Sequence, residues 1–463
     1  LKSRILQELL AVKEIMASMP EDERIVKKDR EYQKELIVLA KRMEIMRGLG
    51  EKAPRGEAQR LAAELEAVRN RYEEFLKQVK FTNAELAALL GVEPPPVRDI
   101  QALLDDDVTV LEYYTGERAT YAWLVTKQGV TMFELAAKER EDAAQSIERS
   151  VDGMLAMNIS SRGRKPAPVI VLPTGESTET TEQQREENRR EFLKKSGELY
   201  ETLVAPVVKE IRTGKLIIVP HGVLHKVPFA CLGTEDKPLM EQYELSTAPS
   251  LSALEYVVKK RKKNNGKLVA FANPETGKTN LAFAEREVQE VEKLFFLRET
   301  YARRDATEGR AKEKAPEPDV VHFACHAEFN DRQPLQSGLL LAGDRDNDGI
   351  LQLHEIFGLN LRQASLVTLS ACETALCKVQ GGEDWAGMSR GFIFAGTPAI
   401  LATLWSVEDK STSILIKSFY ENWLHKGMSK PAALRQAQRE LKAIPEYRHP
   451  YYWAPFVMIG DWR

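Results

Sequence analysis

Two residues that can act together in nucleophilic catalysis each stand near the end of an apolar, strand-like run. His326 ends the core of DVVHFACHA, and Cys372 ends SLVTLSAC. In a mostly parallel sheet, ligands bind at the edge where the strands have their carboxyl ends. If these two strands are neighbours, the imidazole can hold the thiol as a thiolate and later protonate a leaving amine. The sequence therefore predicts a Cys–His dyad.

A purely structural interpretation of both residues stays open from residue type alone. Cysteine is often a small core residue, and histidine at a strand end often only makes hydrogen bonds. The spacing favours catalysis, because Cys372 comes 46 residues after His326, close to the roughly 50-residue interval of caspase-type proteases. Ser370-Ala371-Cys372 stands where that class has Gln-Ala-Cys.

The elements that must position this dyad alternate between strand-like and helix-like patterns from residue 267 onward. The expected strands are 267–272, 297–303, 319–327, 365–372, 399–407 and 453–461, with a hairpin-like run at 335–343. The expected helices are 284–296, 351–358, 385–395, 411–425 and 430–443. This alternation favours an α/β fold with a mostly parallel sheet flanked by helices.

Composition shifts divide the chain into three expected parts. Residues 1–96 have helical spacing, with an apolar stripe at Leu61, Leu65, Val68, Tyr72, Phe75 and Val79, and fit either a helical repeat array or a helical packing subdomain. Alternating strand patterns begin after the triple proline, so 97–260 is predicted as a supporting α/β half and 261–463 as the catalytic half. The polar run 162–190 predicts a mobile loop.

Composition also excludes several classes of protein. The 463 residues carry a formal net charge of −3, which provides no overall footprint for nucleic acid or for an anionic membrane. No run approaches the ~20 apolar residues of a membrane span, and charges occupy the place of a signal peptide's apolar segment. The four cysteines fit neither a disulfide framework nor a zinc pattern. We expect a cytoplasmic protein with reduced thiols and, because it begins with Leu1, a fragment or a processed chain.

An ordered set of motifs from about residue 100 onward resembles the CHAT proteases, caspase-like peptidases of clan CD related to separase. The matching segments are PHGVLHKVPFACL at 220–232, PSLSAL at 249–254, HFACHAEF at 322–329, PLQSGLLLAGD at 334–344, SLVTLSACETA at 365–375, GGEDWAGMSRGFIFAGTPAILATLWSVED at 381–409, FYENWLHKG at 419–427 and HPYYWAPFVMIGD at 449–461. The resemblance implies a caspase-like fold and a cysteine endopeptidase that cleaves protein substrates and needs no cofactor for its chemistry. Residues 1–92 lie outside it and resemble the TPR-like repeat or adaptor segments often fused to CHAT domains.

By this resemblance, His326 is the catalytic base and Cys372 is the nucleophile. The backbone N–H groups of Ala327 and Cys372 are the expected oxyanion donors. Related enzymes commonly have Gly where this chain has Ala327, a difference that matters only if a positive φ is required. Cys325 should point to the opposite face of its strand and belong to the core.

The resemblance also implies a preference for cleavage after basic residues, as in separase-like enzymes. LWSVED resembles the loop that supplies the recognising acid, so Asp409 is the first expectation, with Glu383 and Asp384 as alternatives. Asp409 directly precedes a helical pattern, so a helix-capping role stays open.

An acidic segment between His326 and Cys372 matches the calcium-binding pattern D-x-D-x-D-G-x5-E. The expected calcium ligands are Asp344, Asp346, Asp348, Ile350 and Glu355. The preceding SGLLLAG is typical of a strand rather than of the first helix of a calcium-binding hand. In CHAT proteins a similar DG-x-L-x-x-x-E segment forms a turn and helix start. A calcium site and a solvated acidic turn therefore both stay open.

Two other functions also stay open. Segment 272–279, ANPETGKT, resembles a phosphate-binding loop, but Pro274 and the missing second metal-binding acid argue against an NTPase. A catalytically silent CHAT-fold scaffold is the main alternative to an enzyme. The resemblance further suggests a regulated bacterial defence or cell-death effector, which a regulatory protein partner would control through the N-terminal helical region.

Overall fold

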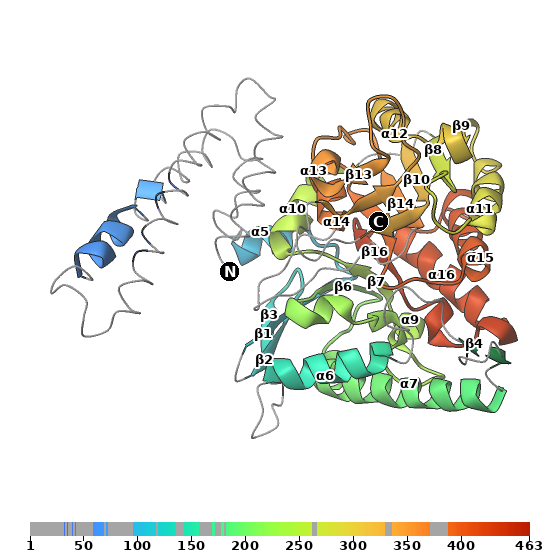
Figure 1. Cartoon of the computed structure of the whole chain (residues 1–463). Helices are drawn as coiled ribbons and strands as arrows, with labels where there is room; N and C mark the ends of the chain where they lie inside the picture. The colour runs from blue at the N-terminus through green and yellow to red at the C-terminus, as the bar shows by residue number, and fades with distance from the viewer. Residues whose placement is uncertain are drawn as a thin grey trace. The chain divides into compact units, whose positions relative to one another are not determined.

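The computed structural model describes most of the chain beyond residue 95. The described residues are 96–116, 119–135, 143–156, 169–171, 177–179, 182–261, 266–328, 336–370 and 388–463, together with 32, 35, 39, 42, 59–68 and 71–72. The chain divides into two compact units, Leu1–Pro95 and Pro96–Arg463 (Figure 1). Cys372, Glu383 and Asp384 lie outside the described residues.

The described residues of the first unit are helical, as predicted. Leu39, Leu61 and Val68 are buried together, and Tyr32 and Leu65 pack against them. These residues belong to two segments far apart in sequence, so the apolar stripe packs one helical segment on another. The predicted stripe members Phe75 and Val79 lie outside the described residues.

An eleven-stranded sheet forms the centre of the second unit, in the order β3-β2-β1-β6-β7-β16-β15-β14-β10-β8-β9. Its strands are β1 (Val108–Thr115), β2 (Thr120–Val125), β3 (Val130–Leu135), β6 (Lys215–Val219), β7 (Glu244–Thr247), β8 (Lys267–Ala272), β9 (Leu297–Ala302), β10 (Val320–Ala324), β14 (Leu366–Ser370), β15 (Ala399–Thr403) and β16 (Phe456–Gly460). The strands β15, β14, β10, β8 and β9 run parallel, and β15 pairs antiparallel with β16. The mostly parallel sheet is therefore confirmed.

Helices cover both faces of this sheet (Figure 1). The α-helices described in the second unit are α5 (Val97–Leu103), α6 (Ala143–Ala156), α7 (Glu182–Leu203), α8 (Ala205–Val208), α9 (Leu239–Gln242), α10 (Leu251–Lys260), α11 (Ala282–Glu292), α12 (Glu308–Lys314), α13 (Leu353–Ile356), α14 (Met388–Ala395), α15 (Asp409–Tyr420) and α16 (Lys430–Lys442). A π-helical turn, Glu421–His425, continues α15. The predicted alternation of strands and helices beyond residue 267 is confirmed.

The central strands are apolar along their length because helices cover them on both sides. Every residue of β10 is buried. Successive side chains point to opposite faces: His322 contacts Tyr420 of α15, and Phe323 contacts Phe392 of α14. Such doubly covered strands are typical of parallel sheets.

Three predicted elements differ in the structure. The predicted strand 319–327 is interrupted, because β10 ends at Ala324 and β11 (His326–Glu328) joins a second sheet with β12 (Gly338–Leu340) and β13 (Ile350–Gln352). The predicted helix 351–358 is only α13, since β13 occupies its beginning. The predicted mobile loop 162–190 includes the short strands β4 (Val169–Val171) and β5 (Ser177–Glu179) and the start of α7, where Glu186 pairs with Arg189 and Arg190 at helical spacing.

The sheet is continuous across residue 260, where the sequence predicts a boundary between two halves. That boundary stays a prediction. Strand β16, from the C-terminal part, lies between β15 and β7 and so joins the two parts. None of the helices in the part of the chain that the structure describes is long and apolar enough to cross a membrane.

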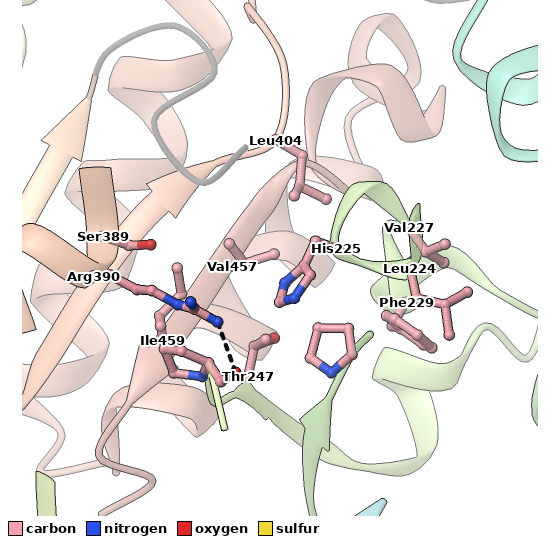
Figure 2. A pocket seen from close by; sticks show the side chains of 12 residues that line it. Leu224, His225, Val227, Phe229, Thr247, Ser389, Arg390, Leu404, Val457 and Ile459 are labelled. Atoms are coloured by element: carbon pink, nitrogen blue, oxygen red, sulfur yellow. Dashed lines mark hydrogen bonds between the residues drawn. The ribbon is translucent and has the colours of Figure 1, made fainter. Parts of the chain in front are cut away.

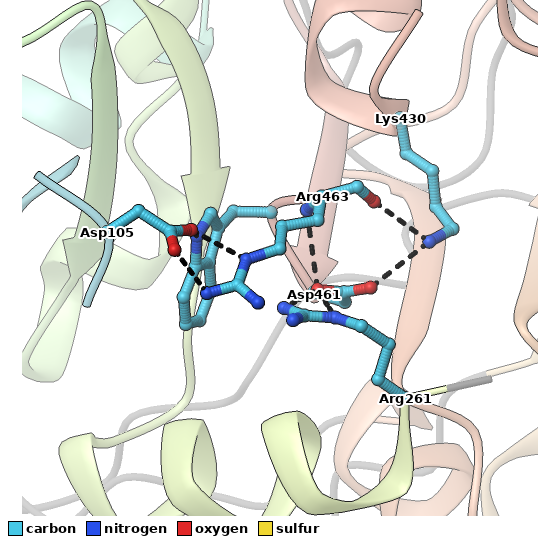
Figure 3. Close-up of polar contacts among 6 residues, drawn as sticks. Asp105, Arg261, Lys430, Asp461 and Arg463 are labelled. Atoms are coloured by element: carbon cyan, nitrogen blue, oxygen red, sulfur yellow. Dashed lines mark hydrogen bonds and ion pairs between the residues drawn. The ribbon is translucent and has the colours of Figure 1, made fainter. Parts of the chain in front are cut away.

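A buried carboxylate ties distant parts of the second unit together (Figure 3). Asp461 is 1% exposed and accepts hydrogen bonds from the Arg261 guanidinium and, at 3.2 Å, from Lys430 Nζ. Arg463 continues the cluster to Asp105. Burial lowers the pKa of Lys430, and the charge of Asp461 opposes that shift. The cluster thus joins α10, α16, the segment before β1 and the chain after β16.

Replacing Asp461 should strongly destabilise the fold. We expect Asp461→Ala to lower the free energy of unfolding by about 3–5 kcal/mol, because it leaves the buried Lys430 ammonium and the partly buried Arg261 guanidinium without their carboxylate. Urea unfolding measures this difference. The control is Glu446→Gln, which removes an exposed pair with Lys410 and should cost less than about 1 kcal/mol. Equal losses in the two variants would contradict a special role for Asp461.

Candidate active site

The strand that precedes His326 and the strand that precedes Cys372 are direct neighbours. Strands β10 and β14 pair in parallel, with Ala324 opposite Ser370. His326 lies two residues beyond Ala324, and Cys372 lies two residues beyond Ser370 in the sequence. The adjacency on which the predicted dyad depends is therefore present. The position of Cys372 itself stays a prediction, because the described part of β14 ends at Ser370.

A backbone carbonyl holds the imidazole of His326. His326 is partly exposed, and its Nε2 lies 2.7 Å from the carbonyl oxygen of Thr279. A carbonyl oxygen only accepts, so Nε2 carries a proton, and in the neutral form of the ring Nδ1 is the acceptor. This tautomer has the basic nitrogen that a thiol requires. No residue-type signal in the sequence indicates such a carbonyl contact.

Asn273 shapes the loop that delivers this carbonyl. It has a positive φ of 46°, and its backbone N–H donates to the carbonyl of Ala324 at the end of β10. Its side chain donates to Asn280 and Glu285 and accepts from the N–H of Leu281. The loop between β8 and α11 is therefore anchored to the strand that leads to His326.

The same loop is the segment that resembles a phosphate-binding loop. Helix α11 begins at Ala282, so Gly277, Lys278 and Thr279 precede its first turn rather than form it. Lys278 Nζ lies 3.8 Å from a carboxylate oxygen of Glu328. The contacts give this loop a role in holding His326, and none of them favours a nucleotide site.

Asp409 lies beside this loop and is half-buried. It is the first residue of α15, and its Oδ2 accepts the N–H of Phe283 in the first turn of α11. Burial raises the pKa of Asp409, while the Phe283 hydrogen bond and, when it is protonated, the positive charge of His326 oppose the increase. Asp409 therefore caps α11 across the fold and lies within electrostatic range of His326. The expectation that Asp409 caps its own helix is not met, because Asp409 lies within the first turn of α15 and its carboxylate caps α11 instead.

The backbone at Ala327 needs no glycine. In the described part of the chain, the non-glycine residues with positive φ are Asn273 and Arg303, so Ala327 has an ordinary φ in β11. Its N–H stays a predicted oxyanion donor. Cys325, the residue before His326, is 1% exposed and belongs to the core, as expected.

The other cysteine in the described residues is a poor nucleophile. Cys231 is buried, and burial raises the pKa of its thiol to about 12. A thiol with such a pKa is protonated near neutral pH and unreactive. Among the described cysteines, then, neither Cys231 nor Cys325 competes with Cys372 for the nucleophile's role.

The acidic segment 344–355 forms the turn of the β12–β13 hairpin and the start of α13. Asp344 accepts from the N–H groups of Gly309 and Asp346, and Asp348 accepts from that of Ile350. Glu355 accepts from the N–H of Gln352 in a capping box. These hydrogen bonds give the acids a structural role.

A lysine lies among the same acids. Lys312 Nζ lies 2.6 Å from Glu308, 2.7 Å from Glu355 and 2.9 Å from Asn347. Within the described residues no group of three or more His, Cys, Asp or Glu side chains is arranged to hold a metal ion. Calcium binding by Asp344, Asp346, Asp348, Ile350 and Glu355 stays a prediction, and calcium would have to displace the Lys312 ammonium from Glu355.

The glycine of the calcium pattern has a different explanation in this hairpin. Gly349 has a φ of +91°, and a Cβ there would lie 2.9 Å from both Gly343 N and Leu341 O. The hairpin therefore requires Gly at this position with or without an ion.

A recess between the two halves of the sheet is mainly apolar (Figure 2). Leu224, Phe229, Leu404, Val457 and Ile459 contribute to its wall. Arg390 also lines it and donates to the carbonyl of Pro249. None of the described residues that line it is acidic, so this recess does not suit the basic side chain that the sequence predicts.

Removing the Lys312 ammonium tests the structural role of the acidic hairpin. We expect Lys312→Met to lower the free energy of unfolding by about 1–3 kcal/mol, because Glu308 and Glu355 lose a charged hydrogen-bond donor. Thermal or urea unfolding with calcium and with chelator measures the effect. Unchanged stability would contradict the structural role, and recovery by calcium alone would support the calcium site.

Comparison with known proteins finds one matching family and two relatives of the same name. The CHAT domain family matches residues 193–461. Human Tetratricopeptide repeat protein 28 is 24% identical over 322 residues, which cover 57% of this chain and 13% of the human protein. The mouse protein of the same name is 28% identical over 134 residues, which cover 29% of this chain and 5% of the mouse protein. The chain thus spans a small part of these relatives' length.

Two solved structures are similar to this chain at low sequence identity. The separase–securin complex of Saccharomyces cerevisiae has a TM-score of 0.47 and 13% identity, covering 79% of this chain and 30% of that chain. The Arg-specific cysteine proteinase gingipain R has a TM-score of 0.41 and 10% identity, covering 69% of this chain and 74% of that chain. The family match includes β10, β14 and both predicted dyad residues and covers more than half of the sequence, so this chain belongs to the CHAT-domain family.

Proposed function

We propose that this chain is a cysteine endopeptidase in which Cys372 is the nucleophile and His326 is the base. The observation that carries the proposal is the pairing of Ala324 with Ser370, from which the two residues follow at equal distance in sequence. Neighbouring strands lie about 4.8 Å apart, and two residues of chain reach at most about 7 Å. These lengths are compatible with contact between the thiol and the imidazole.

The tautomer of His326 supports this division of roles. With Nε2–H on the carbonyl of Thr279, Nδ1 takes the proton of the Cys372 thiol. The thiolate sulfur forms a bond to the scissile carbonyl carbon, and the imidazolium donates its proton to the leaving amine as the C–N bond breaks. Water then hydrolyses the thioester and restores the thiol. The Thr279 carbonyl also accepts from the imidazolium, which stabilises the intermediate charge.

Backbone N–H groups of Ala327 and Cys372 are the proposed oxyanion donors. Such donors lower the barrier because they meet the charge that develops in the tetrahedral intermediate. All the groups in this mechanism belong to the chain itself. Clan CD chemistry needs no cofactor, and the proposed steps use none.

The decisive experiment compares the new protein N-termini that appear when a proteome is digested separately with the wild type and with three variants. Wild type should generate termini that Cys372→Ala abolishes and that His326→Ala reduces by about 10²–10⁴-fold, the usual contribution of a general base. The matched control is Cys377→Ala, which removes the other cysteine of the same segment and should leave cleavage intact. The same termini from Cys372→Ala would refute the proposal.

A catalytically silent scaffold is the alternative function. The helical packing around Leu39, Leu61 and Val68 and the repeat proteins among the relatives favour a protein-binding role for the N-terminal unit. We propose that this unit binds a regulatory protein partner. Wild type that generates no Cys372-dependent termini, either alone or with a captured partner, would favour the scaffold. The role in bacterial defence stays a prediction.

We further propose that the substrate has a basic residue at the cleavage site and that Asp409 contacts it, with Glu383 and Asp384 as alternatives. Asp409 is half-buried near His326. Its Oδ2 is used by Phe283 N, so recognition would involve the remaining carboxylate oxygen. A carboxylate in such a site can pair with Lys or Arg.

Asp409→Asn separates recognition from capping, because the amide keeps an oxygen acceptor for Phe283 and removes the charge. We expect cleavage after Lys or Arg to lose at least about tenfold in kcat/KM, equal to about 1.4 kcal/mol, and cleavage after neutral residues to be unchanged. Peptide-library cleavage measures the preference. The matched control is Glu408→Gln, which neutralises the exposed neighbouring acid. An unchanged preference in Asp409→Asn would exclude this residue and leave Glu383 and Asp384.

A further inference from the structure

Five polar side chains form a connected group inside the fold, between the catalytic strands and two helices. They are Glu287 of α11, His322 of β10, Thr368 and Ser370 of β14, and Tyr420 of α15. Glu287 is 1% exposed, and His322, Thr368 and Tyr420 are fully buried. Burying so many polar groups destabilises a fold unless all of them are hydrogen-bonded.

The contacts run without a break from one end of the group to the other. Ser370 Oγ donates to Glu287 Oε2 at 3.2 Å, and Glu287 Oε1 lies 2.8 Å from His322 Nε2. His322 Nδ1 lies 3.2 Å from the Tyr420 hydroxyl, which lies 2.7 Å from Thr368 Oγ1. We refer to these five residues as the Glu287 network.

One set of proton positions satisfies every member of the Glu287 network. Burial raises the pKa of Tyr420, so its hydroxyl keeps its proton and can donate it to His322 Nδ1. His322 then donates from Nε2 to Glu287, which also accepts from Ser370, and Tyr420 accepts from Thr368. A fully satisfied buried network favours one arrangement of the elements it joins.

Helix α11 connects this network to His326, the second residue of the proposed dyad. Glu287, in the second turn of α11, holds Ser370, the residue two positions before Cys372. The loop that immediately precedes α11 holds His326 through the carbonyl of Thr279. One helix therefore supports the end of β14 through a side chain and the imidazole through its N-terminal loop.

We infer that the Glu287 network is a positioning device that sets the end of β14, and with it Cys372, relative to His326. This inference rests on the proposed function for its role in catalysis. Its members touch neither substrate nor reacting atoms, so they are positioning residues. A displacement of about 1 Å at a reacting group can cost about 10²-fold in rate, which explains how the partly buried hydrogen bond of Ser370 affects the chemistry.

The direct test removes the Ser370 hydroxyl and then restores it. The probe is iodoacetamide, and mass spectrometry with fragmentation follows alkylation of Cys372 separately from Cys377. Ser370→Ala should slow alkylation of Cys372 by about tenfold, because a misplaced thiol loses the thiolate that His326 stabilises. Ser370→Thr keeps the hydroxyl and should retain the wild-type rate. Equal rates in wild type and Ser370→Ala would overturn the inference.

A matched pair of tyrosine variants separates positioning from stability. Tyr420→Phe removes the hydroxyl of the network, and Tyr113→Phe removes an equally buried hydroxyl that donates to the Leu203 carbonyl in the supporting half. Both should lower the melting temperature, but only Tyr420→Phe should slow alkylation of Cys372. Equal slowing in both variants would reduce the network to a general contribution to stability.

Alkylation reports on the thiol without requiring a substrate, so this inference and the proposed function can fail separately. If wild type generates no Cys372-dependent termini but Ser370→Ala still slows alkylation, the network positions the thiol and the proposed peptidase activity is wrong. If cleavage occurs and Ser370→Ala cleaves with wild-type kcat and KM, the peptidase stands and the positioning role is wrong. A lower kcat with an unchanged KM supports both.

Discussion

The parallel register between β10 and β14 is the constraint on which the candidate site depends. A shift of one residue would move every side chain of a strand to the other face of the sheet. His322 would then lose Glu287 and Tyr420, and Ser370 would lose Glu287, leaving polar groups buried without partners. The polar residues within these apolar strands therefore fix the register of β10 and β14. The same register places the ends of these two strands, just before His326 and Cys372, side by side.

The loop after β8 contributes through its backbone, which explains why its sequence is misleading. Gly277, Lys278 and Thr279 have the residue types of a phosphate-binding loop, yet the group that matters is the Thr279 carbonyl. Asn273 turns the chain with a positive φ and satisfies the loop's polar groups. Similar residue types thus serve a loop that holds an imidazole, because Gly, Asn and Thr favour tight turns in either context.

Sequence patterns predict the parts of this fold that depend on local apolar periodicity. Strand 267–272 and helix 430–442 agree closely with expectation, and strand 399–403 begins where expected but ends four residues before the expected end at 407. The break after Cys325 depends on pairing of β11 with β12 from a later segment, which local pattern does not contain. The contact between His326 and Thr279 involves a backbone atom and has no residue signature. Glu287 had a detectable signal, a carboxylate on the apolar face of a helix, but its partner His322 appears only when the strand and helix are packed.

Asp409 illustrates how capping and electrostatics are coupled at this site. Its carboxylate accepts the N–H of Phe283 at the start of α11 and lies within electrostatic range of His326. Because α11 also carries Glu287 and follows the Thr279 loop, loosening this cap would disturb both supports of the dyad. Loss of activity after substitution of Asp409 would therefore not identify substrate recognition. A change in the preference between basic and neutral cleavage sites does identify recognition. Disturbance of the dyad lowers the cleavage rate for both kinds of substrate, whereas loss of an ion pair lowers it only for the substrate with a basic residue.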